Sequence, residues 1–98
     1  MKTVWKFPIS CNSVKNAQYQ IFLQMPRGAE PLCVMHQPMS GVCIWAEVDP
    51  EQPIERRRFW CIGTGHGAVP ENAKYLGSVV ENDYVWHLYE PLSGGCMK

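Results

Sequence analysis

The sequence predicts a mostly β protein, either a compact antiparallel β-sandwich or a partly open barrel of about seven short strands. Three observations indicate this fold class. Apolar and polar side chains alternate with the period of two typical of half-buried strands, as in Thr3-Trp5-Phe7-Ile9. Turn-forming residues recur about every ten positions. The only helical candidate is a single turn over residues 70–74, which is too short to be stable on its own.

The first four expected strands cover residues 3–9, 18–25, 32–38 and 42–48. Pro26-Arg27-Gly28 ends the second strand, and Met39-Ser40-Gly41 joins the third and fourth strands as a hairpin. Prolines 50 and 53 then interrupt the pattern before an arginine-rich strand begins.

Two further strands, at residues 75–81 and 84–90, form a hairpin over Asn82-Asp83. In the last strand, alternation places His87 and Tyr89 on one face and Trp86 and Leu88 on the other. The chain of 98 residues is expected to form one globular domain over residues 1–92, with a flexible C-terminal tail over 93–98.

Charge and cysteine content narrow the function classes. Nine basic and nine acidic residues give no net charge, so direct nucleic-acid binding driven by a basic excess is not expected. The broken apolar run after Lys2 is neither a signal peptide nor a membrane span. Five cysteines without a C-x-x-C motif indicate a reducing compartment, and no metal site or cofactor is expected.

The segment from Arg56 to Gly67 carries the candidate site. Alternation places Arg56, Arg58 and Trp60 on one face of its strand, next to the turn Gly63-Thr64-Gly65-His66-Gly67. Arginine beside tryptophan and the amides of a glycine-rich turn suits an anionic, planar ligand. The structural alternative is that the arginines pair with nearby acidic residues and the turn only connects two strands. The expected ligand-binding residues are Arg56, Arg58, Trp60, Gly63, Thr64, Gly65, His66, Trp45 and His87.

Motifs for catalysis are incomplete. The third glycine of the turn comes one position too early for G-x-G-x-x-G, and no helix is expected to follow it. The histidines lack the paired spacing of a zinc site, and Cys61 lies in an apolar strand that would raise the pKa of its thiol. We therefore expect a protein that is not an enzyme and has no catalytic residues.

Several blocks together carry a resemblance. They are Trp45-Ala46-Glu47-Val48-Asp49-Pro50, Ile62-Gly63-Thr64-Gly65-His66 and Val85-Trp86-His87-Leu88-Tyr89-Glu90, and their order resembles that in a small family of proteins encoded by tailed phages and prophages. The resemblance implies a phage origin, a location in the host bacterial cytoplasm, and a role in host takeover or anti-defence.

The leading hypothesis is a non-catalytic, homo-oligomeric binding protein that sequesters a nucleotide-like anionic small molecule. The first alternative is a protein-directed inhibitor of the anti-CRISPR type, which would occlude a host defence protein through a flat arginine and aromatic patch. The second alternative is a phage structural or assembly accessory protein. None of these hypotheses involves a membrane.

Overall fold

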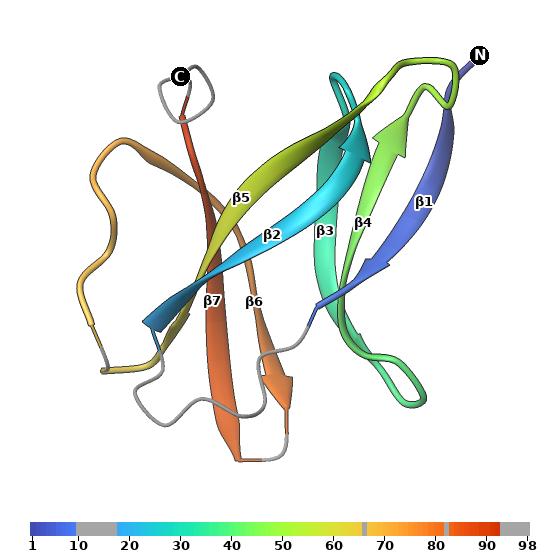
Figure 1. Cartoon of the computed structure of the whole chain (residues 1–98). Helices are drawn as coiled ribbons and strands as arrows, with labels where there is room; N and C mark the ends of the chain where they lie inside the picture. The colour runs from blue at the N-terminus through green and yellow to red at the C-terminus, as the bar shows by residue number, and fades with distance from the viewer. Residues whose placement is uncertain (10–17, 66, 82, 93–98) are drawn as a thin grey trace.

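The computed structural model of the chain describes residues 1–9, 18–65, 67–81 and 83–92, and shows seven strands (Figure 1). They are β1 (Thr3–Pro8), β2 (Gln18–Pro26), β3 (Glu30–Gln37), β4 (Gly41–Val48), β5 (Ile54–Gly63), β6 (Ala73–Glu81) and β7 (Tyr84–Pro91). All pairings are antiparallel, and the strands form two sheets that do not close into a barrel. The predicted mostly β sandwich is confirmed, whereas the predicted tail over 93–98 lies outside the described residues.

One sheet has the order β1-β4-β3 and the other the order β2-β5-β7-β6. The predicted hairpins β3–β4 and β6–β7 are both present. The pairings of β1 with β4 and of β2 with β5 join strands that are not consecutive in the chain. The sheets approach each other where β6 passes β3: a Cβ built on Gly77 would lie 3.5 Å from Cβ of Val34.

The core lies between the inner faces of the two sheets. The three-stranded sheet contributes mainly Val34, Val42, Ile44, Ala46 and Val48, and the four-stranded sheet mainly Phe59, Cys61, Val79, Trp86 and Leu88. Because side chains alternate along a strand, burial of Phe59 and Cys61 turns Arg58 and Trp60 to the outer face of the four-stranded sheet.

The predicted helical turn over residues 70–74 is wrong. Asn72 has a φ of +55°, in the left-handed region that ends a right-handed helix, and β6 begins at Ala73. The Asn72 carbonyl accepts a hydrogen bond from the backbone N–H of Leu92 at 2.7 Å, which ties this turn to the end of β7. The described residues form no long apolar helix of the kind that spans a membrane.

Candidate ligand-binding face

An aromatic row crosses the outer face of the four-stranded sheet. Trp60 on β5 lies opposite Tyr89 on β7, and Tyr89 lies opposite Tyr75 on β6. The rings of Tyr75 and Tyr89 are 5.5 Å apart between centroids, in a tilted arrangement. Trp60 and Tyr89 are half-buried and Tyr75 is exposed. The aromatic row, Trp60–Tyr89–Tyr75, therefore presents ring surface to a ligand on this face.

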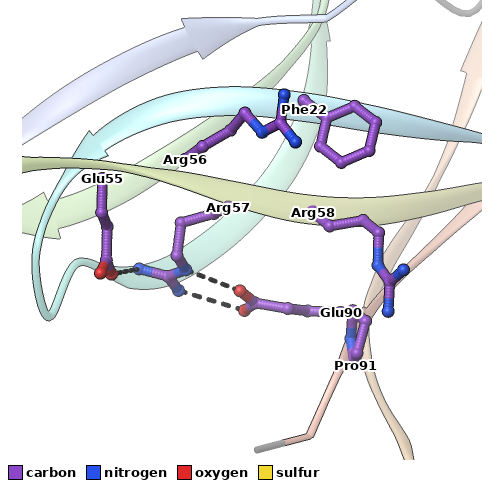
Figure 2. A pocket seen from close by; sticks show the side chains of 7 residues that line it. All are labelled: Phe22, Glu55, Arg56, Arg57, Arg58, Glu90 and Pro91. Carbon is purple, nitrogen blue, oxygen red and sulfur yellow. Dashed lines mark hydrogen bonds and ion pairs between the residues drawn. The ribbon is translucent and has the colours of Figure 1, made fainter. Parts of the chain in front are cut away.

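On one side of the aromatic row lies a hollow of about 340 Å³, which we call the arginine hollow (Figure 2). β5 pairs with β7 only from Trp60 to Gly63. The hollow is lined by the part of β5 before Trp60, where the two strands are not paired. Its lining residues are Phe22, Glu55, Arg56, Arg57, Arg58, Glu90 and Pro91.

Arg57 has a structural role in this hollow. Its Nε and one terminal nitrogen donate to the two carboxylate oxygens of Glu90, at 2.8 and 3.2 Å, and its other terminal nitrogen donates to the Ala29 carbonyl at 3.0 Å. Glu55 lies 4.0 Å from the same guanidinium. This charge is therefore compensated within the protein, as the ion-pair interpretation of the arginines expects. The main partner, Glu90, comes from β7 rather than from the preceding loop.

Arg56 and Arg58 differ from Arg57. The guanidinium of Arg56 lies 4.5 Å from the centroid of the Phe22 ring, a cation–π contact that leaves its positive charge in place. The Nε of Arg58 is buried and has no hydrogen-bond partner among the described residues. In this part of the chain, neither guanidinium lies within 4.0 Å of a carboxylate. The positive charges of Arg56 and Arg58 are therefore not paired with a carboxylate among the described residues.

A second hollow, of about 250 Å³, lies on the other side of the aromatic row, between the glycine-rich turn and β7. We call it the glycine hollow. The turn is anchored by the Thr64 backbone N–H, which donates to the Val85 carbonyl, and Gly65 adopts a φ of +77°. The lining residues are Ile62, Gly63, Thr64, Gly65, Gly67, Val69, His87 and Tyr89. The predicted contact from His66 falls outside the described residues.

Hydrogen bonds hold His87 from both sides at this hollow. Its Nε2 lies 2.7 Å from the Thr64 hydroxyl, and its Nδ1 lies 2.7 Å from the Ser78 hydroxyl. Ser78 is in turn 2.6 Å from the Tyr75 hydroxyl. Hydroxyl groups can donate or accept, so this network is compatible with either neutral tautomer of the imidazole and with its protonated form. Because one bond runs to the turn after β5 and the other to β6, the ring cannot rotate without breaking both.

The structure separates some of the predicted site residues. Arg58 and Gly63, the last residue of β5, are five positions apart on the strand, about 17 Å at 3.3 Å per residue, and Thr64 follows in the turn. A single phosphate cannot contact the side chains of both Arg58 and Thr64 at this spacing, so the predicted ligand-binding residues fall into two groups on this face. Trp45 lies in the other sheet, opposite Lys6 and Cys33, and does not join this face. Arg56, Arg58, Trp60, Thr64 and His87 do share the outer face of the four-stranded sheet.

Sequence reasoning missed Phe22, Tyr89 and Tyr75 as parts of this face. Alternation alone places Tyr89 beside His87, so that signal was present in the sequence. Phe22 and Tyr75 reach the face only through the pairing of β2 with β5 and through the register shift in β6 after Tyr75. No local pattern encodes either feature. The described residues contain no cluster of three or more His, Cys, Asp or Glu that could hold a metal ion.

The fold and this face define a small all-β domain with two hollows on either side of an aromatic row. The chain matches the model of the family described as "Domain of unknown function (DUF7352)" over residues 1–94, and it belongs to that family. No curated protein and no solved structure matches the chain.

Proposed function

We propose that this protein binds a nucleotide-like anionic small molecule on the outer face of its four-stranded sheet and does not transform it. The observation that carries the proposal is the position of Arg58. Its guanidinium has no acidic partner within 4.0 Å in the described chain, and Arg58 precedes Trp60 by two positions on the same face. That spacing is about 7 Å along the strand, which one nucleotide can span from phosphate to base.

The two groups suit the two ends of such a ligand. A guanidinium donates in a planar fork that fits phosphate oxygens, and that of Arg58 has no carboxylate within 4.0 Å among the described residues. Arg56 adds a second positive charge, held over Phe22. The half-buried rings of Trp60 and Tyr89 offer a surface on which a planar base can stack. Tight sequestration of this kind needs preorganised contacts and no acid, base or nucleophile.

The biological setting we propose follows from the family resemblance described above. A phage protein in the host bacterial cytoplasm that sequesters a nucleotide-like molecule would act in anti-defence or host takeover by lowering the concentration of a signal or metabolite. We also propose that the protein acts as a homo-oligomer, since large apolar side chains such as Val4, Trp5 and Tyr84 are exposed on a single chain.

Isothermal titration calorimetry with adenosine monophosphate tests the proposal. We expect saturable binding to the wild-type protein and a loss of about 1.5–3 kcal/mol in Arg58→Ala, the range for a hydrogen bond to a charged group. Arg27→Ala is the matched control: it removes the same charge from an exposed turn outside the arginine hollow. Equal affinity of Arg58→Ala and wild type, or no binding by any purine or pyrimidine mononucleotide, would contradict the proposal.

A second candidate is a protein-directed inhibitor of the anti-CRISPR type. The exposure of Phe22 and Tyr75 around the arginines favours it, because interface hot spots are enriched in aromatic residues and arginine. Under this alternative, Phe22→Ala and Arg58→Ala would weaken the capture of one host protein, while mononucleotides would produce no heat on titration.

A further inference from the structure

We infer that the glycine hollow is a second ring-binding site, and that the preferred ligand is a linear dinucleotide with a 5′-phosphate rather than a mononucleotide. The inference rests on the proposed function, since it takes the arginine hollow as the phosphate site. It adds a second base to the proposed ligand, and it assigns the binding of that base to the residues that line the glycine hollow.

The lining of the glycine hollow suits a ring better than a phosphate. Its described lining contains no Lys, Arg, Asp or Glu, in contrast to the arginine hollow. Ile62, Val69 and Tyr89 supply apolar and aromatic surface, while the hydroxyl of Thr64 supplies a polar group. An uncharged cavity with a few polar groups is typical of sites for heteroaromatic rings. The described lining offers no Lys or Arg to compensate a dianionic phosphate.

His87 is arranged to offer its ring face. Both of its nitrogens already have hydroxyl partners at 2.7 Å, Thr64 on one side and Ser78 on the other. A ligand can therefore contact the imidazole face without displacing either bond. The Tyr75 hydroxyl, 2.6 Å from Ser78, extends the network that keeps this ring in place. A preorganised aromatic ring loses little conformational entropy when a base stacks on it.

The spacing of the two hollows fits two nucleotides in line. Arg58 and Ile62 are four positions apart on β5, about 13 Å, and Trp60 lies between them with Tyr89 at its side. A phosphate at Arg58 places the first base on Trp60 and Tyr89, and the next base then reaches the glycine hollow. The absence of net charge on the chain does not oppose this arrangement, since a dinucleotide brings only two phosphates to a face that holds Arg56 and Arg58.

The test compares three ligands by titration calorimetry: adenosine monophosphate, the dinucleotide pApA, and the same dinucleotide without its second base. We expect pApA to bind about five- to 150-fold more tightly than the mononucleotide, the fold-change that corresponds to one stacked base. The abasic dinucleotide carries the same phosphates as pApA and should bind like the mononucleotide.

Two variants test whether the higher affinity for pApA comes from the glycine hollow. Val69→Glu places a charge in the wall of the glycine hollow at an exposed position, and should remove the advantage of pApA while leaving the affinity for the mononucleotide unchanged. Val4→Glu, an equivalent change at an exposed position on the other sheet, should alter neither. Three results would overturn the second site but not the first. They are equal affinities for pApA and the mononucleotide, a gain in affinity with the abasic dinucleotide equal to that with pApA, and an undiminished gain for pApA in Val69→Glu. No binding by any of the three ligands overturns both.

Discussion

Three consecutive arginines in this protein have different surroundings. Arg57 forms a two-bond ion pair with Glu90 and a third bond to a carbonyl, and both side chains of the pair are only about one-sixth exposed. Arg58 has a buried Nε without a hydrogen-bond partner in the described chain. An unpartnered buried donor does not stabilise the folded state.

This contrast predicts effects of different size for two alanine substitutions. Arg57→Ala should lower the free energy of unfolding by about 1–3 kcal/mol, because it leaves Glu90 half-buried and unpaired. Arg58→Ala should change it by less than about 0.5 kcal/mol, because the loss of stem packing is offset by removal of an unsatisfied donor. Urea denaturation measures both. If Arg58→Ala is as destabilising as Arg57→Ala, then Arg58 has a structural role.

Cys43 gives the protein a predicted sensitivity to alkaline pH. Burial raises the pKa of its thiol, and the nearby charge of Lys6 opposes this only in part. The unfolded chain therefore ionises this thiol at a lower pH than the folded chain. Its contribution to stability is fully present below the ordinary thiol pKa of about 8.5 and is lost as the pH rises above that value.

The corresponding measurement is the free energy of unfolding of wild type and Cys43→Ala between about pH 7 and pH 10. We expect the wild type to lose more stability over this range than the variant, since the other titrating groups are common to both. Parallel curves would show that Cys43 titrates alike in the folded and unfolded chains.

At the scale of elements, the contact between β6 and β3 brings the two sheets together. Gly77 has a φ of +153° beside the register shift in β6, and a Cβ there would meet Val34. Gly28 also has a positive φ, +83°, but nothing within 4 Å of its Cβ position. Backbone strain is therefore common to substitutions at both glycines, whereas only at Gly77 would an added Cβ reach van der Waals contact with Val34, which leaves little room for the further methyl groups of a valine.

Gly77→Val should consequently lower the melting temperature more than Gly28→Val. Strain alone accounts for about 1–3 kcal/mol at either position, and overpacking against Val34 adds about 1–3 kcal/mol at Gly77. Differential scanning calorimetry of the two variants provides the comparison. Equal shifts would mean that β3 moves aside at little cost and that this contact does not fix the sheets.

Local sequence patterns predicted where the strands lie in the chain, but not which strands pair with one another in the sheets. Alternation correctly placed Arg58 and Trp60 on one face and Phe59 on the other, and the two hairpins followed from their short connections. The helical turn failed because Asn72 adopts a left-handed conformation that favours a turn. Pairing of β2 with β5 depends on contacts between distant parts of the chain, which periodicity does not encode. Phe22 could not be assigned to the site without that pairing.

For the whole molecule, the grouping of site residues depended on which sheet each strand joined. Trp45 and Trp60 look equivalent in sequence, since each alternates with buried neighbours. The sheet order places them in different sheets, and only Trp60 lies next to the arginine hollow. The distance along β5 likewise divides the predicted site into two hollows. The length of a strand can be predicted from the sequence. The position of the glycine-rich turn, which forms the glycine hollow together with β7, cannot.

Exposed apolar side chains also predict the behaviour of the molecule in solution. Val4 and Trp5 on β1, Ile54 on β5 and Tyr84 on β7 are all exposed in a single chain. Self-association would cover part of this surface, so light scattering should give a mass above the 11.2 kDa of one chain. A mass of one chain at high protein concentration would contradict the expected homo-oligomer.

If a nucleotide binds beside Arg58 on the aromatic row, the tryptophan indole N–H signals in a ¹⁵N-correlated NMR spectrum report its binding most directly. Four tryptophans give separate reporters: Trp60 on the proposed face, Trp86 in the core, and Trp5 and Trp45 in the other sheet. On titration with adenosine monophosphate, the Trp60 indole signal should shift progressively to saturation, with Trp5 and Trp45 unchanged, and Arg58→Ala should move the midpoint to a higher ligand concentration. An unchanged Trp60 signal, or a saturable shift of Trp45 in its place, would contradict this account.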